Sequence, residues 1–253
     1  MSNELIQVKA PPMKALVFLF MVMLSLGTVA QKFSDEYKVG DKLYVCSKEG
    51  ISLRPAPDAK AAKIIVVSYA TAVIVQADPN PRVPFVSTGV PGAWVKVTAG
   101  GKLGYVFDGF ISRFKPMDLA TDPRGRDLEE ITQYLTTLSK VETKKTWSAE
   151  AGTSPPEECD FCFGYEKIVL ASGAEYEQRA YEGGSVVSIS FPSSIITFQE
   201  TYLMARMMYN EFFTTPCPYN EGDMTCLFEN DENITLKISK DGGRNTIQWG
   251  HAD

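Results

Sequence analysis

Short strand-like runs, each followed by turn residues, set the strongest limit on how the N-terminal part of the chain can fold. Six runs rich in β-branched and aromatic residues occur at 42–46, 51–54, 63–67, 72–76, 93–97 and 104–106. None is long enough to predict a helix, and Gly100 and Gly101 allow the positive φ that a tight hairpin turn needs. The pattern therefore predicts a closed or nearly closed β-barrel of five or six short strands.

The motifs in these runs follow a specific order. They read ISLRPAP at 51–57, AKII at 62–65, AVIV at 72–75, GAWVKV at 92–97 and GKLGYVFDGFIS at 101–112. In this order they resemble a bacterial SH3 (SH3b) domain over residues 38–115. Two features depart from the family: Ala56, Val66 and Ala70 stand where it usually has glycine, and residues 78–92 lengthen one loop.

The resemblance implies a binding function, because SH3b modules occur in exported proteins and often bind cell-wall peptides or position a neighbouring domain. Such a barrel offers a shallow groove in which aromatic faces and a few charges hold an extended peptide. The candidate ligand-binding residues are Trp94, Tyr105, Phe85, Phe107, Arg54, Arg82 and Asp108. For each aromatic residue, packing in the core is the alternative role.

The second part of the chain has a mixed pattern. Leu128, Ile131, Leu135 and Leu138 recur at helical spacing and predict an amphipathic helix over 127–141. Three strand-like runs at 165–171, 174–181 and 185–191 predict an antiparallel meander, and residues 234–239 and 245–249 predict a hairpin.

A second helix is predicted after residue 196. Thr197 and Glu200 form a capping-box pattern, although the run Ile195-Ile196-Thr197 also suits a strand. We expect a five-stranded sheet covered on one face by two helices. The predicted fold class is mainly β with α+β: an SH3-like small β-barrel followed by an α+β domain.

Charge divides the chain in the same place as the strand pattern. Residues 31–115 hold 12 Lys and Arg against 7 Asp and Glu, a net charge of +5, whereas residues 116–253 hold 11 against 23, a net charge of −12. A linker rich in Pro, Gly and Asp, at 116–126, separates a barrel at 31–115 from an acidic domain at 127–253. The total, 25 basic against 31 acidic residues, excludes a generally basic nucleic-acid binder.

The first thirty residues predict export. Lys14 precedes an apolar run at 15–26, interrupted by Ser25, and the small residues 27–30 suit cleavage before Gln31. A membrane anchor is the alternative, but the uncharged stretch is shorter than the roughly 20 apolar residues of a spanning helix. We therefore expect a secreted or periplasmic mature chain without an integral membrane span, whose translation starts at Met1 or Met13.

Cysteines are the most distinctive local feature of the acidic domain. It contains four of them: Cys159, Cys162, Cys217 and Cys226. In an exported protein, four cysteines predict two disulfides, and three pairings exist. We expect Cys159 and Cys162 each to bond across to Cys217 and Cys226. A four-thiolate zinc site is the alternative, and Cys46 is expected to be a buried free thiol.

Catalytic motifs are scarce in the sequence. It has a single histidine, His251, and no glycine-rich phosphate loop or serine-nucleophile elbow. We predict no catalytic residue, metal or cofactor. We expect an exported non-enzymatic binding protein whose SH3b-like domain recognises peptidoglycan or a protein or peptide, and whose acidic domain is a second interaction domain. One alternative is an exported hydrolase or modifying enzyme that the barrel targets, which requires a pocket with two carboxylates of separated pKa. The other is a disulfide-stabilised structural protein of the envelope.

Overall fold

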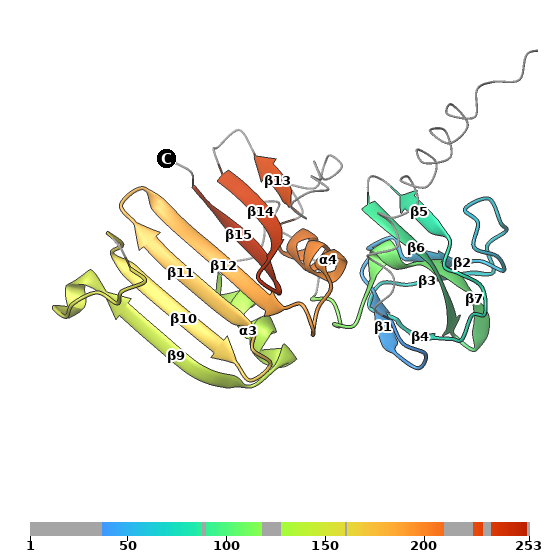
Figure 1. Cartoon of the computed structure of the whole chain (residues 1–253), viewed down its shortest axis with the longest axis horizontal. Coiled ribbons are helices and arrows are strands. Elements are labelled where there is room, and N and C mark those ends of the chain that lie inside the picture. The colour runs from blue at the N-terminus through green and yellow to red at the C-terminus, as the bar shows by residue number, and fades with distance from the viewer. Residues whose placement is uncertain are drawn as a thin grey trace, which may run out of the picture.

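The computed structural model describes residues 37–87, 90–117, 128–159, 161–209, 225–229 and 234–251. These residues form antiparallel sheets and two α-helices, so the protein is mainly β (Figure 1). The predicted signal peptide at 1–30 lies outside the described residues, as does most of the predicted linker. None of the described helices has the length and apolar character that crossing a membrane requires. Below, residues 37–117 are the N-terminal region and residues 128–251 the C-terminal region.

The N-terminal region contains eight short strands. They are β1 (Lys42–Val45), β2 (Ile51–Leu53), β3 (Ile65–Val67), β4 (Ala72–Val75), β5 (Pro84–Ser87), β6 (Val90–Ala99), β7 (Lys102–Phe107) and β8 (Ile111–Ser112). One sheet has the order β5-β6-β4-β1-β8 with β7 also paired to β6, and β2 pairs with β3. A bridge between Arg54 and Tyr105 connects the β2–β3 pair to β7.

All six predicted strands of this region are present, with shifted ends, and two further strands were missed. The segment at 78–92 was expected to be a lengthened loop, but it contains β5, which pairs with β6 from Pro84↔Ala93 to Ser87↔Val90. β8 follows a single 3₁₀ turn, η1 (Asp108–Phe110). Apolar side chains that alternate along these strands, such as Leu43, Val73 and Val97, form a compact core of the region.

The C-terminal region is built on a seven-stranded antiparallel sheet. Its strands are β9 (Val141–Ser148), β10 (Gly164–Leu170), β11 (Glu175–Tyr181), β12 (Gly184–Pro192), β13 (Cys226–Glu229), β14 (Ile234–Asp241) and β15 (Arg244–His251). The order across the sheet is β13-β14-β15-β12-β11-β10-β9. The expected meander and hairpin are confirmed, but the sheet has seven strands rather than five. The edge strand β9 was missed because its sequence is polar and carries Lys144 and Lys145, which is typical of an exposed edge.

Two α-helices accompany this sheet. α3 (Leu128–Leu138) confirms the first predicted helix, although it ends earlier than expected because Val141 begins β9. α4 (Phe198–Met208) begins with the predicted capping box: the Thr197 hydroxyl accepts from the Glu200 N–H (2.9 Å), and the Glu200 carboxylate accepts from the Thr197 N–H (3.0 Å). This reciprocal pairing satisfies two backbone donors, so a helix forms here rather than a strand.

α4 lies between the C-terminal sheet and the N-terminal region. It contacts β14 and β15 on one side and β8 on the other (Figure 1). As a result, every residue of the helix except Arg206 is buried. The largest apolar core therefore includes Val90, Trp94, Phe107 and Met117 of the N-terminal region together with both helices and the C-terminal sheet.

Candidate functional site

The predicted aromatic residues do come together on β5, β6 and β7. Trp94 and Phe107 are directly opposite each other on β6 and β7, and the Phe85 ring lies 5.3 Å from the ring of each. Trp94 and Phe107 are only 5% and 6% exposed, because they belong to the core shared with the C-terminal region. These two side chains therefore have the core-packing role that the sequence left open, and Phe85 packs against the same core while half-buried.

Gly92 makes this packing possible. A Cβ atom at this position would stand 2.7 Å from Cε2 of Phe107, which is closer than any side chain tolerates. Because Gly92 has no side chain, the Phe107 ring can pack directly against the backbone of β6.

Tyr105 and Arg54 form a second, more exposed part of the predicted site. Their backbones exchange two hydrogen bonds of 2.9 and 2.7 Å, and the Arg54 guanidinium donates to the Ala61 carbonyl. The Tyr105 ring lies under the Lys96 ammonium at 5.9 Å, and its hydroxyl interacts with Asp78. Both side chains are half-buried, so they remain accessible to a ligand.

Asp108 is buried at the start of η1, where its carboxylate contacts other groups of the protein. Its carboxylate accepts from the Ala93 N–H (2.7 Å) and lies 4.0 Å from the Arg82 guanidinium. The side-chain amide of Gln199, on α4, lies near the Asp108 carboxylate, but no hydrogen bond of normal length joins the two groups. Burial raises the pKa of Asp108 to about 7, against the opposing effects of the Ala93 N–H and Arg82.

Glu200 is a second buried carboxylate, and it connects α4 of the C-terminal region to the N-terminal region. Besides capping α4, its carboxylate accepts from the Arg113 N–H (2.6 Å) and the Ser112 hydroxyl (3.3 Å), and it lies 3.9 Å from the Arg113 guanidinium. Burial raises the pKa of Glu200, and the Arg113 charge opposes that rise. One side chain thus joins the start of α4 to the end of β8.

Tyr37 connects the two carboxylate contacts. The Arg82 and Arg113 guanidinium groups both lie over its ring, at 5.6 and 5.4 Å from the centroid. The Tyr37 hydroxyl donates to the Ile111 carbonyl (3.3 Å), and Arg82 donates to the Tyr37 carbonyl (3.2 Å). Asp108, Arg82, Tyr37, Arg113 and Glu200 therefore form one continuous polar network beneath α4.

An open groove of about 680 Å³ runs beside this network, between the segment after β8 and helix α3. We refer to it as the inter-region groove. Its lining combines aromatic, cationic, acidic and amide side chains: Tyr44, Arg113, Phe114, Lys115, Pro116, Met117, Glu130, Gln133, Tyr134, Thr137 and Leu138. The Tyr134 hydroxyl donates to the Lys115 carbonyl (2.9 Å), which fixes α3 against the segment after β8.

Sequence reasoning missed this groove. Its two walls are separated by residues 118–127 in the chain, and no motif marks Tyr44 or Tyr134. Glu200 was recognised only as a helix-capping residue, because a capping-box pattern contains no information about a tertiary partner. Spacing along one element cannot show which segments meet.

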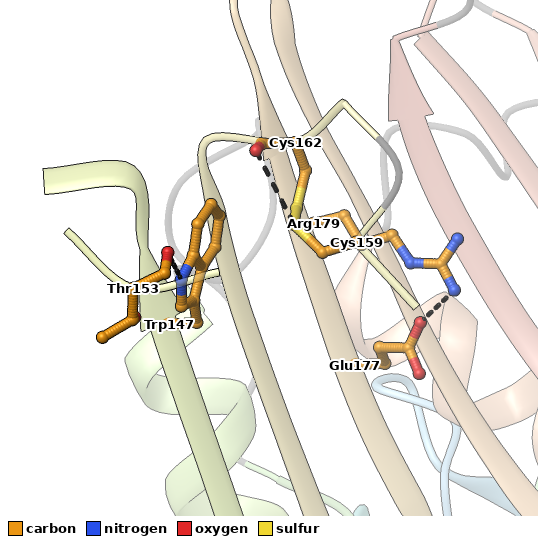
Figure 2. The surroundings of a disulfide bond; sticks show 6 residues. All are labelled: Trp147, Thr153, Cys159, Cys162, Glu177 and Arg179. Carbon is orange, nitrogen blue, oxygen red and sulfur yellow. Dashed lines mark hydrogen bonds and ion pairs between the residues drawn. A yellow bond between two sulfur atoms is a disulfide. The ribbon is translucent and has the colours of Figure 1, made fainter. Parts of the chain in front are cut away.

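The cysteine pairing differs from the expectation. Cys159 and Cys162 form a disulfide with each other, with their Cα atoms 5.3 Å apart, so the predicted cross-pairing was wrong (Figure 2). A zinc site of four thiolates is incompatible with this bond. Cys226 is also disulfide-bonded, and Cys217 lies outside the described residues.

Cys46 is a buried free thiol, as predicted. Burial raises its pKa, which keeps the thiol protonated and unreactive. Within the described part of the chain, no group of three or more His, Cys, Asp or Glu side chains is arranged to hold a metal ion.

Comparisons of the chain with protein-family models, with curated proteins and with solved structures found no match.

Proposed function

We propose that the protein is an exported, non-enzymatic binding protein whose SH3b-like N-terminal region recognises a peptide or a cell-wall component in the inter-region groove. The observation that carries the proposal is the groove itself, with aromatic rings and charges of both signs around an open space of about 680 Å³. Ligand sites combine apolar surface with a few fixed polar groups, and they occur preferentially where two structural units meet.

The chemistry of the lining fits an extended peptide. Tyr44 and Phe114 are half-buried and offer aromatic faces, while Lys115 is exposed and suits a carboxylate. Glu130 and Gln133 on α3 face the same space and suit an amine and a peptide bond. A wall peptide carries all of these groups.

The environment of the buried carboxylates also favours binding over catalysis. A hydrolase of the alternative kind needs two carboxylates with separated pKa values that face a common pocket. Among the described residues, the two acids whose pKa burial raises are Asp108 and Glu200. They do not line the groove, and their oxygens accept from backbone N–H groups. Their geometry matches structural anchors.

Two tryptophan variants test whether the ligand binds in the groove: one fills the groove, and the other lies beside it. Thr137 and Thr136 are neighbouring exposed residues of α3, and each hydroxyl donates to a carbonyl three residues earlier, but only Thr137 lines the groove. We expect Thr137→Trp to abolish sedimentation of the protein, from residue 31 onwards, with purified peptidoglycan, and Thr136→Trp to leave it unchanged. Soluble wall peptides in a calorimetric titration then distinguish a peptide from the polymer as ligand.

A charge pair provides a second control. Lys115→Glu removes the exposed cation of the groove, whereas Lys102→Glu makes the same change at the exposed first residue of β7. We expect a loss of about tenfold in affinity for Lys115→Glu and a smaller, salt-dependent change for Lys102→Glu. Equal effects of the two, or no binding by the wild type at low salt, would rule out the groove as the wall site.

A further inference from the structure

The outer face of the N-terminal sheet carries two predicted ligand-binding residues that do not line the inter-region groove, Tyr105 and Arg54. Along β6 and β7, alternate side chains belong to the compact core, and the intervening ones point away from it. At one end of this outer face, Trp94 and Phe107 are buried in the core shared with the C-terminal region. Farther along, Tyr105 is half-buried and Leu103 is exposed, so this part of the face is open to solvent.

Strand register places the open side chains in two adjacent rows. The first row crosses β1, β4, β6 and β7 and contains Lys42, Ile74, Thr98 and Leu103. In the second row, Lys96 and Arg54 lie on either side of Tyr105. The rows share a face, because residues 96 and 98 are two positions apart on β6. We refer to six of these residues as the open sheet face: Lys42, Ile74, Leu103, Lys96, Tyr105 and Arg54.

The three cations of the open sheet face form no ion pair with any described residue. The Lys42 and Lys96 ammonium groups lie over tyrosine rings instead, at 5.3 Å from the Tyr44 centroid and 5.9 Å from the Tyr105 centroid. The Arg54 guanidinium donates to a backbone carbonyl. None of these contacts neutralises the positive charge, so the charge is available to an anion.

The acids of the N-terminal region are engaged elsewhere. Outside the polar network beneath α4, its described acids accept hydrogen bonds from groups within three residues along the chain: Asp41, Glu49, Asp58 and Asp78. Asp78 also interacts with the Tyr105 hydroxyl and with the Lys96 charge, so it belongs to the surroundings of the open sheet face. Three cations against this one carboxylate leave the face with an excess of positive charge.

A complementary partner combines negative charge with apolar groups. Ile74 lies between Lys42 and the strand that carries Lys96, and Leu103 is 55% exposed next to these cations. Lys96 and Arg54 are two strand spacings apart, about 10 Å, and an extended polypeptide covers about 10 Å in three residues. A peptide with an acid at every third position and apolar residues between therefore matches the face, whereas a phosphate polymer has no groups for Ile74 and Leu103.

We propose that the open sheet face binds an extended acidic segment of a partner protein. Its carboxylates pair with Lys96 and Arg54, and its apolar side chains contact Ile74 and Leu103. Charge complementarity specifies this partner. The proposal goes beyond ligand binding in the inter-region groove, since no residue of the open sheet face lines that groove.

Fluorescence anisotropy with a labelled peptide of repeated Glu-Leu-Ser units tests the proposal. We expect the protein from residue 31 onwards to bind this peptide, and Lys96→Glu to weaken the affinity at least about tenfold. Lys48→Glu is the matched control, because Lys48 is exposed between β1 and β2 and is not part of the open sheet face. It should change the affinity less than about twofold. Lys42→Glu, at an exposed position, repeats the test in case Lys96→Glu disturbs the fold.

A charge exchange separates direct contact from a structural role of the lysines. The double variant K42E/K96E should bind a peptide of repeated Lys-Leu-Ser units, which the wild type does not bind. A structural role would not produce this reversal of preference.

The apolar part of the face has its own pair of variants. Leu103→Ser should weaken peptide binding at least about threefold, whereas Val86→Ser, which changes a residue that is 61% exposed on β5, should not. Absence of peptide binding at low salt, or equal weakening by Lys96→Glu and Lys48→Glu, would overturn the proposal. Tighter binding of inorganic polyphosphate than of the peptide would overturn it in favour of a phosphate polymer.

Discussion

Helices α3 and α4 are both eleven residues long, but their surroundings are opposite. α3 buries Ile131 and Leu135 and exposes its polar side toward solvent and the inter-region groove. α4 is buried on all sides, polar residues Gln199, Glu200 and Thr201 included, because the sheet covers one side and the N-terminal region the other. The difference separates a helix that borders a binding surface from a helix that joins the two regions, and substitutions should therefore have unequal effects on the two.

The largest effect is expected for Glu200→Ala. This change removes the buried carboxylate that faces the Arg113 guanidinium and accepts from two backbone N–H groups, and removal of a buried, hydrogen-bonded charge costs about 3–5 kcal/mol. Urea unfolding measures the loss. Glu130→Ala on α3 is the comparison, with an expected change within about 0.5 kcal/mol for a surface position. A loss below about 1 kcal/mol for Glu200→Ala would contradict the joining role of α4.

The next largest effect is expected in the pH dependence of the unfolding free energy. The folded-state pKa of Asp108, about 7, lies above an unfolded value of about 4, so the folded protein binds this proton more tightly. The stabilising contribution is complete below about pH 4 and is lost as the pH rises to about 7. Glu200 acts in the same direction.

Asp108→Asn should therefore flatten the decline of the unfolding free energy between about pH 4 and pH 7. Urea titrations at a series of pH values measure this slope. Asp58→Asn, at an exposed position of the same region, is the control and should retain the wild-type slope. An unchanged slope in Asp108→Asn would show that other groups set the pH dependence.

The smallest effects on stability are expected for one identical substitution, threonine to alanine, on each helix. Thr201 is buried and its hydroxyl donates to the Thr197 carbonyl (2.9 Å), while Thr136 is exposed and donates to Gln133 (2.7 Å). We expect Thr201→Ala to cost about 1–3 kcal/mol and Thr136→Ala to change stability by less than about 0.5 kcal/mol. Thermal unfolding of the two variants should rank them in this order, and equal melting temperatures would argue against the difference in burial.

The sequence was sufficient to predict both helices and most of the strands. The periodic leucines of α3 and the capping box of α4 are local signals, and β10 to β12 follow from alternating runs between glycine turns. Strands β5, β8, β9 and β13 were missed because prolines conceal β5, exposed lysines conceal β9, and β8 and β13 are short. The burial of Gln199-Glu200-Thr201 was not predictable, because a polar triplet at a helix start normally faces water.

The candidate site was predictable to a lesser degree. Cross-strand register places Trp94 and Phe107 opposite each other, but their burial depends on the C-terminal region, which no local pattern reveals. The inter-region groove depends on two walls that are distant in sequence. The disulfide partner was mistaken because spacing alone allows both a local and a distant pairing.

The contact of Glu200 with Ser112 and Arg113 also determines when, during folding, the two regions can be joined. These partners are 88 and 87 residues apart in the chain, so a long loop must close before the contact forms. During synthesis, the N-terminal region is therefore finished first, with Trp94 and Phe107 lacking the cover that the C-terminal region later supplies. That interval is the period in which a nascent chain is most exposed to aggregation, and a chaperone that shields these rings until residue 200 arrives would raise the yield of folded protein.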